Sequence, residues 1–450
     1  MTVRVRSTAR SLGRRGASFL SATVLLVAGA ALARQSDEEI DPAKVALGER
    51  LFQDLNFTNQ AADYGASCAG CHATGSSIQG RTARAWNDYT PTSLTAKKAT
   101  TLRNTPSLLG SASRQYLGWD GAHQDLAELI FEKLVGTQLG WEPKDRDRAL
   151  AAVHFTLLEE GSGGGTGPTY AESFEAAYGM ALEAVGVEQA VRLGAGAIAD
   201  YVRSIEPTNT APWDAFAEMN RFDTPNEGED PKDFAYGVWS RIGNQEGRRL
   251  IKRPKGFSAD AYLGFRTFFR VDDVEPGAVG NCVTCHVPPN FTDDRFHNVG
   301  ISELEYDEVH GAGSAAKLEL PGQASQLTAS RPTADAAAAI DLGRFNVEPS
   351  RENAGAFRTP GLRRSSGTDP YMHNGRYETL ADAVRAHATA AAKARAGELP
   401  WADEELKILQ IEEQDIVQLV AFLEQLNEVP REDFRTFLIK LADDELSYDW

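Results

Sequence analysis

The chain has 450 residues, 42% of them hydrophobic and 24% charged, so it is long enough to bury more than one ordinary core. Acidic residues outnumber basic ones by 64 to 46, and the formal net charge is −18. Such an excess of negative charge makes nucleic acid and anionic membrane surfaces unfavourable partners. It suits a basic partner protein, although a solvated acidic surface without a partner explains the charge equally well.

The first 33 residues have the pattern of a secretory signal peptide. Five arginines precede a small, apolar stretch from Ala17 to Ala30, and Ala31-Leu-Ala33 fits the small-x-small cleavage pattern. An uncleaved membrane anchor is the alternative, but the stretch is short and alanine-rich for a spanning helix. We expect cleavage near Ala33 and a periplasmic mature chain with 41 basic and 64 acidic residues.

The sequence predicts a mainly helical fold. Asp41-Pro42 is a typical helix start, and three segments place apolar residues at helical spacing. These residues are Leu47, Leu51, Phe52 and Leu55; then Val187, Val191, Ala195, Ile198 and Val202; then Ile416, Leu419, Val420 and Leu423. Segment 208–212 breaks the second helix and begins the crossing into the second half of the chain. The glycine run at 161–165 and the charged stretch 222–232 are expected to be loops.

Two pentapeptides are the most specific signal in the chain: Cys68-Ala-Gly-Cys71-His72 and Cys282-Val-Thr-Cys285-His286. This pattern is typical of c-type haem attachment, in which both thiols bond to the porphyrin and the histidine binds the iron. A zinc site or a redox dithiol is the alternative for Cys-x-x-Cys alone. Because His follows the second Cys in both copies and the chain has only 4 Cys, we expect two haems and no structural disulfide.

One such motif in each half predicts two cytochrome c-like haem domains with long loops. The expected domains are 34–215 and 216–450. Within the second, residues 302–340 are rich in Ala and Ser, are interrupted by Gly and Pro, and are expected to form an exposed insertion.

The second axial ligands of the two irons must come from few residues. Between His72 and Trp119 the chain has neither His nor Met, so no local second ligand is available to the first iron. An open iron face lets peroxide bind, whereas two strong axial ligands favour electron transfer. The other candidates in the mature chain are His123, His154, His297, His310, His373, His387, Met180, Met219 and Met372.

Several short motifs, in order and interleaved with the haem motifs, resemble those of bacterial dihaem cytochrome c peroxidases and MauG-type enzymes. They are Leu47-Gly-Glu-Arg-Leu-Phe52, Arg103-Asn-Thr-Pro106, Gly118-Trp-Asp-Gly121, Phe291-Thr-Asp293, Phe296-His-Asn-Val-Gly300, Phe357-Arg-Thr-Pro360, Pro370-Tyr-Met-His-Asn-Gly375 and Ala421-Phe-Leu423. The resemblance implies an N-terminal haem that reacts with hydrogen peroxide and a C-terminal haem that receives electrons from a small cytochrome c or cupredoxin. Members of this family are often homodimers.

The resemblance also implies roles for individual residues. Trp119 matches the family tryptophan that lies between the haems and helps electrons to pass; core packing is its alternative role. Asn104 matches a side-chain ligand of calcium, and Thr368 and Pro370 match positions that offer carbonyl oxygens to the same ion, as a hard cation prefers. The alternative is that these three are turn residues and nothing more.

His387 occupies the family position of the C-terminal haem's Met or Tyr ligand, fourteen residues beyond His373. We expect it to bind the iron opposite His286; Met372 is the competing ligand, and a role as a core histidine is the alternative. Imidazole in place of a thioether would lower the reduction potential of this haem. The surrounding segment also predicts a helix capped by Thr379 with an inward face. That face comprises Leu380, Ala383, Val384 and His387.

Gln138 lies nearest to the family position of the distal glutamate, in Thr137-Gln-Leu-Gly140. Peroxide cleavage needs a group that moves a proton between the two oxygens; Glu can do this, whereas Gln can only orient hydrogen bonds. Glu128, Glu132 or His123 are alternatives, and His123 could instead bind the first iron and close it. Three functions therefore stay open: a peroxidase, a MauG-like oxidase of a partner protein's aromatic side chain, and a non-enzymatic electron carrier.

Overall fold

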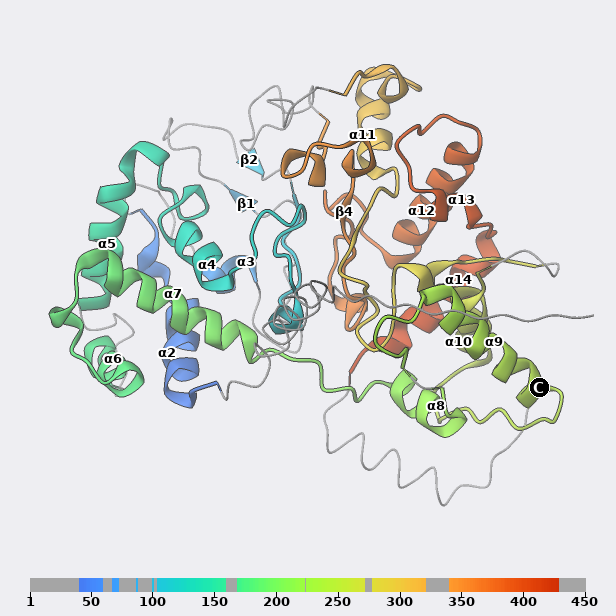
Figure 1. Ribbon diagram of the computed structural model, residues 1–450, viewed down its shortest axis with the longest axis horizontal. Coiled ribbons are helices and arrows are strands. Elements are labelled where there is room, and N and C mark those ends of the chain that lie inside the picture. The colour runs from blue at the N-terminus through green and yellow to red at the C-terminus, as the bar shows by residue number, and fades with distance from the viewer. Residues whose placement is uncertain are drawn as a thin grey trace, which may run out of the picture. The chain divides into compact units, whose positions relative to one another are not determined.

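The computed structural model describes residues 40–59, 67–72, 86–87, 99–100, 103–158, 168–222, 224–271, 277–320 and 340–428. The described part is mainly helical, as predicted (Figure 1). Its helices are α2 (Pro42–Gln53), α3 (Cys68–Cys71), α4 (Leu126–Leu134), α5 (Arg146–Leu158), α6 (Tyr170–Tyr178), α7 (Val187–Arg203), α8 (Pro212–Asn220), α9 (Pro231–Glu246), α10 (Ala259–Phe269), α11 (Ile301–His310), α12 (Leu380–Arg395), α13 (Glu404–Ile408) and α14 (Glu413–Leu423). The predicted signal peptide and the glycine run at 161–165 lie outside the described residues.

In the described ranges, four two-residue strands form two antiparallel pairs. Strand β1 (Trp86–Asn87) pairs with β2 (Ala99–Thr100), and β3 (Phe296–His297) pairs with β4 (Phe357–Arg358). In the second pair Phe296 lies opposite Arg358 and His297 lies opposite Phe357. This pair joins segments about sixty residues apart beside the second haem motif, so it matters for the site.

The first core forms where α2 crosses α7. Asp41 caps α2 by accepting a hydrogen bond from the Ala43 N–H (2.9 Å), as its sequence predicts. A Cβ on Gly48 would lie 1.9 Å from the Ala197 carbonyl oxygen, so only glycine allows this crossing. Leu47, Leu51 and Phe52 are buried as expected. Leu55 is not: α2 ends at Gln53, and Leu55 lies in a following 3₁₀ turn with 55% of its surface exposed.

The second core is aromatic and surrounds Trp213. Its ring packs on Phe269 at 5.6 Å between centroids and lies edge-on to Phe291 and Phe422. Helices α8, α9, α10 and α14 supply most of this cluster, and α10 crosses α14 at a glycine, Gly264. The first apolar cluster spans residues 47–202 and the second 213–426, on either side of the predicted crossing segment. The exact domain boundaries stay a prediction.

Two loop predictions are partly wrong. Residues 301–310 form helix α11, in which Glu303 is fully buried, so the first part of segment 302–340 is packed rather than exposed. Residues 321–339 of that segment lie outside the described ranges. The stretch 222–232 ends inside a helix, because α9 begins at Pro231 with Asp230 as its cap.

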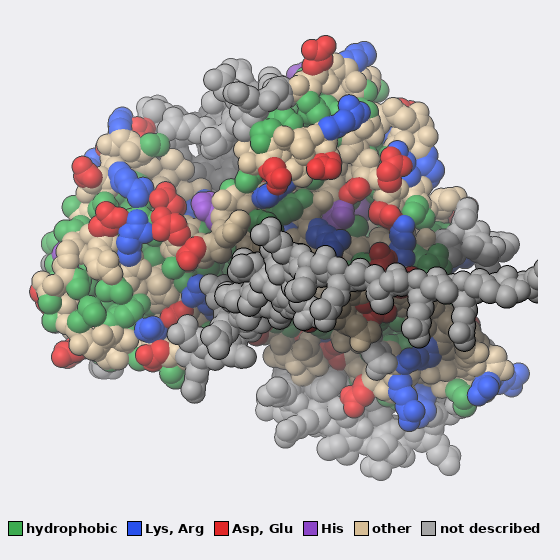
Figure 2. Space-filling model, viewed as in Figure 1, with side chains coloured by type: hydrophobic (Ala, Val, Ile, Leu, Met, Phe, Trp, Pro, Cys, Tyr) green, Lys and Arg blue, Asp and Glu red, His purple; other side chains and the backbone are tan. Residues whose placement is uncertain are grey.

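The charge of the surface is mixed. Figure 2 shows acidic and basic side chains interspersed with apolar ones on the face drawn. Within the described ranges, no helix combines the length and the apolar character needed to cross a membrane.

Candidate functional site

A cavity of about 260 Å³ lies at the second Cys-x-x-Cys-His motif and is lined by Cys282, Cys285 and His286. Helix α12 contributes another part of the lining. Its cap is Thr379, whose hydroxyl accepts a hydrogen bond from the Asp382 N–H (3.1 Å). The cap and the inward face of this helix are thus confirmed. The residues that α12 contributes are Leu380, Ala383, Val384 and His387.

Two imidazoles in this cavity, those of His286 and His387, have the hydrogen bonding that is typical of metal-binding histidines. His286 places Nδ1 2.9 Å from the Phe291 carbonyl oxygen, and His387 places Nδ1 2.9 Å from the Ala383 carbonyl oxygen. An Nδ1–H that donates to a carbonyl leaves Nε2 with a free lone pair, which is the arrangement of metal-binding histidines. Burial lowers the pKa of both rings, that of His286 to about 4, so both are neutral at pH 7. The residues therefore fit a haem iron with two imidazole ligands; Met372 also lines the cavity.

The cysteines lie in surroundings that suit thioether bonds. Burial and the neighbouring thiol of the same motif raise the pKa of Cys68 and of Cys282 to about 12, which keeps both thiols neutral. A structural zinc site needs several converging ligands as thiolate or imidazole. In the portion of the chain that the structure describes, no group of three or more His, Cys, Asp or Glu side chains could hold a metal ion. The histidine that follows the second cysteine of both motifs stays the observation that favours haem over zinc.

The first motif is anchored on the first core. Ser67 caps α3 by accepting a hydrogen bond from the Gly70 N–H (3.2 Å), and the His72 N–H donates to the Cys68 carbonyl (2.7 Å). The His72 ring lies 6.3 Å from the ring of Phe52 on α2. Burial lowers its pKa to about 4, and the backbone of Pro106 partly offsets this effect. His72 is thus a neutral, partly buried imidazole, as suits a proximal ligand.

Trp119 lies at the cavity of the second motif and is hydrogen-bonded to a segment of the first half of the chain. Its indole N–H donates to the Asn104 carbonyl (2.7 Å), two residues before Pro106, and its ring lies 6.5 Å from the ring of His373. Both Trp119 and His373 line the cavity of the second motif. The arrangement is compatible with the predicted electron relay.

Asn104 and Pro370, two of the three predicted calcium ligands, are in contact. The Asn104 side-chain amide donates to the carbonyl oxygens of Pro370 (2.5 Å) and Met372 (3.4 Å). The amide oxygen of Asn104 accepts a hydrogen bond from the Thr105 N–H (2.9 Å), which fixes the amide with its nitrogen toward those carbonyls. Thr368 lines the same cavity. Calcium binding by these residues stays a prediction.

Comparison with known proteins agrees with this geometry. A family model described as di-haem cytochrome c peroxidase matches residues 42–221. The cytochrome-c peroxidase IdrP1 of Denitromonas iodatirespirans is 26% identical over 397 residues, which cover 87% of this chain and 83% of that protein. The methylamine utilization protein MauG of Methylorubrum extorquens is 26% identical over 393 residues, covering 87% and 80%. The chain is thus similar to members of the di-haem cytochrome c peroxidase/MauG family along most of its length.

Similarity to this family implies two haem c cofactors, in agreement with the two Cys-x-x-Cys-His motifs. The fold agrees as well. The diheme peroxidase BthA from Burkholderia thailandensis matches with a TM-score of 0.54 at 18% identity, covering 87% of each chain. The relatives include both peroxidases and MauG proteins, so the similarity indicates an oxidoreductase of peroxidase or oxidase type without separating the two.

Gln138, the predicted distal residue, lies at an exposed position, unlike His286 and His387, which line a cavity. Gln138 lies in an exposed 3₁₀ turn, Thr137–Leu139. Two of the alternatives are engaged in exposed ion pairs, Glu128 with Arg192 at 2.6 Å and Glu132 with Arg146 at 3.4 Å. The distal role of Gln138 therefore stays a prediction. Burial and then Lys133 lower the pKa of His123, which leaves this half-buried ring neutral and able to accept a proton.

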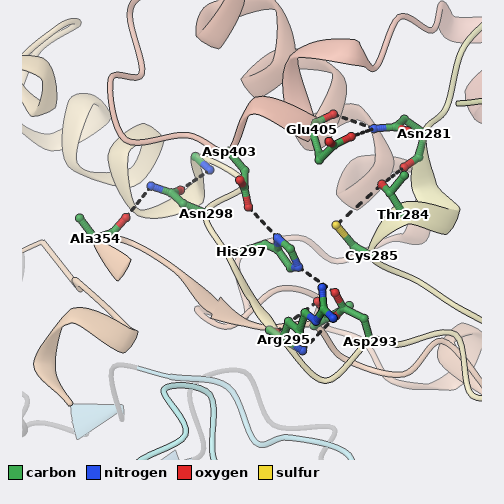
Figure 3. A network of polar contacts seen from close by, with 12 residues as sticks. Asn281, Thr284, Cys285, Asp293, Arg295, His297, Asn298, Ala354, Asp403 and Glu405 are labelled. Carbon is green, nitrogen blue, oxygen red and sulfur yellow. Dashed lines mark hydrogen bonds and ion pairs between the residues drawn. The ribbon is translucent and has the colours of Figure 1, made fainter. Parts of the chain in front are cut away.

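Sequence reasoning missed a charged cluster beside the second haem motif (Figure 3). His297 on β3 bonds to Asp403 through Nδ1 (2.6 Å) and to Asp293 through Nε2 (2.9 Å). Burial opposes a charge here, but the two carboxylates outweigh it and raise the pKa of His297 to about 12, with Cys285 close by. The only sequence signal was the motif that contains His297, because Asp403 lies 106 residues away.

Proposed function

We propose that this protein is a periplasmic dihaem peroxidase that reduces hydrogen peroxide to water with electrons from a small cytochrome c or cupredoxin. One observation supports the proposal above all: His286 and His387 line one cavity, each with Nδ1 bonded to a backbone carbonyl. No comparable second ligand lies near His72 in sequence. A haem with two imidazole ligands suits electron transfer, and a haem with one suits peroxide binding.

Haem, when bound, supplies the redox chemistry of both sites. His72 would hold the first iron, and His286 with His387 would hold the second. Trp119 would connect the two sites, because its indole N–H is fixed to Asn104 and its ring lies beside the second cavity. Gln138 would orient peroxide or water by hydrogen bonds, since an amide does not exchange protons as a carboxylate does.

A MauG-like oxidation of a partner protein is the second candidate. Three of the curated relatives are named MauG. Imidazole ligation by His387, where the family has Met or Tyr, would lower the potential of the second haem and make it a poorer acceptor for electrons from an ordinary donor. If electrons from a donor arrived slowly, the two sites would stay oxidised for longer. An aromatic side chain of a partner protein could then supply the electrons instead.

Spectroscopy and turnover of the two-haem protein test the proposal. A five-coordinate, high-spin first haem with rapid peroxide reduction by a reduced cytochrome c or cupredoxin supports the peroxidase. Slow turnover with oxidation of a protein encoded beside it supports the MauG-like function. Two low-spin haems that do not react with peroxide would leave a non-enzymatic electron carrier.

The cellular location and assembly form part of the same proposal. We propose that the signal peptide is removed near Ala33 and that the mature chain forms a homodimer. Mass spectrometry of the periplasmic fraction should find a chain that starts near Arg34, and sedimentation should give twice the chain mass. A chain that keeps residues 1–33 and stays with the membrane fraction would favour the uncleaved anchor.

A further inference from the structure

The four backbone carbonyls of the turn 118–121, which contains Trp119, accept hydrogen bonds from residues in the second half of the chain. Arg358 donates to its first two carbonyls, from Nε to Gly118 (3.3 Å) and from the backbone N–H to Trp119 (2.8 Å). Arg344 donates Nη1 to its last two, those of Asp120 (3.2 Å) and Gly121 (3.0 Å). Every carbonyl of this turn thus accepts a hydrogen bond from one of two arginines more than two hundred positions away.

Arg344 is itself fixed in one orientation. It is 8% exposed, its guanidinium packs over the rings of Tyr116 (4.9 Å) and Phe296 (4.5 Å), and Nη2 pairs with Glu348 (3.1 Å). A planar guanidinium with several donors can satisfy adjacent carbonyls and a carboxylate at once, which an ammonium group on a lysine cannot do in the same geometry. The contact needs a glycine opposite it. A Cβ on Gly121 would lie 2.3 Å from the Phe296 ring and 2.9 Å from Nη1 of Arg344.

Arg358 links the turn to the second haem motif. It lies on β4, which pairs with β3, and β3 holds His297 in the cluster beside Cys285 shown in Figure 3. Its charge is balanced by Asp294 at 3.1 Å, and its side chain is 3% exposed. The β3–β4 pair therefore connects the residues around the second haem to the backbone of Trp119 through a continuous set of hydrogen bonds.

We propose that Arg344 and Arg358 are positioning residues that fix Trp119 at the second haem cavity and so set the rate at which electrons pass between the two haem sites. This inference rests on the proposed function. With haem bound at both motifs, Trp119 would give one electron to the first site and take one from the second site in each passage. Two such passages would supply the two electrons that, with two protons from solvent, convert one hydrogen peroxide to two waters. The indole proton stays on nitrogen, because the Asn104 carbonyl that accepts its hydrogen bond is a weak base.

Arg344→Lys tests the inference in the two-haem protein. The substitution keeps the positive charge but removes the planar guanidinium, whose nitrogens bond to the carbonyls of Asp120 and Gly121 and to Glu348 at the same time. Displacing a reacting group by about 1 Å can cost on the order of a hundredfold in rate, so we expect the second haem to respond to peroxide at least about tenfold more slowly in rapid-mixing spectra. The initial reaction of the first haem should be unchanged. Electron paramagnetic resonance should show the tryptophan-centred radical altered in yield or line shape, a signature that a merely structural role would not change.

Arg351→Lys is the matched control, since Arg351 is an exposed arginine in a nearby 3₁₀ turn. It should behave like the wild type. Gly121→Ala provides a second variant that moves the turn by a different route and covers the case in which Arg344→Lys does not fold. Wild-type transfer rates and radical signal in whichever of these two variants folds would overturn the inference while leaving the proposed function intact. A wild-type protein that shows no transfer between the haems would overturn both.

Discussion

Glu303 on α11 is a carboxyl group with no exposed surface, and its burial predicts how stability depends on pH. Asn298 donates to one of its oxygens (3.0 Å) and the Trp401 N–H lies 3.4 Å from the other. These hydrogen bonds favour the ionised form, but burial outweighs them and raises the pKa from 4.5 to about 7. Asp307, one helical turn away, adds to the rise.

The sign and size of the effect follow from linkage. Because the folded protein holds this proton more tightly than the unfolded chain, the stabilisation is complete below pH 4.5 and is lost as the pH rises to about 7. A difference of roughly 2.5 units at 1.36 kcal/mol each corresponds to about 3 kcal/mol of unfolding free energy. Glu303→Gln keeps the shape and an acceptor oxygen but cannot ionise, so this loss should be absent from the variant.

Denaturant unfolding of the two-haem protein at pH 4.5, 6 and 8 measures this difference between wild type and variant. Other groups titrate in both proteins, so the difference isolates Glu303. Glu308→Gln, on the same helix with 60% of its side chain exposed, is the matched control and should follow the wild type. If Glu303→Gln lost stability with pH as steeply as the wild type, the assignment of a buried, protonated carboxyl would be wrong.

Three further outcomes follow from single contacts. His387→Met should raise the reduction potential of the second haem, within the range of about 0.8 V that axial ligands span, as a redox titration would show; an unchanged potential would contradict ligation by His387. Gly264→Ala would place a Cβ 1.9 Å from the Gln418 carbonyl oxygen, so thermal unfolding should show a loss of about 1–3 kcal/mol, and an unshifted midpoint would mean that α10 and α14 separate freely. Arg363 donates two hydrogen bonds to the Asp214 carboxylate (2.8 and 2.9 Å), and Arg363→Met would leave that carboxylate as a largely buried, unpaired charge. Urea unfolding should show a loss of about 3–5 kcal/mol in the free energy of unfolding. A loss below about 1 kcal/mol would show that water compensates the charge.

Local features of this chain were predictable because their physics acts over a few residues. The two Cys-x-x-Cys-His motifs, the cap of α2 at Asp41 and the inward face of α12 after Thr379 each depend on spacing within one or two helical turns. The same reasoning failed for Leu55, since periodicity alone does not show that α2 ends at Gln53. It failed again for residues 301–310, whose helix is stabilised by burial against distant segments.

The sequence by itself determined that this chain has two Cys-x-x-Cys-His motifs and a mainly helical fold, and its resemblance to the family predicted His387 as a ligand of the second haem. Only the tertiary structure decided that His387 and His286 line one cavity, that Asp403 reaches His297, and that Arg344 and Arg358 hold the turn of Trp119. These contacts join residues about a hundred or more positions apart. No periodicity or local propensity encodes such pairs, because they form only when the packing of whole helices brings distant backbone segments within hydrogen-bonding distance.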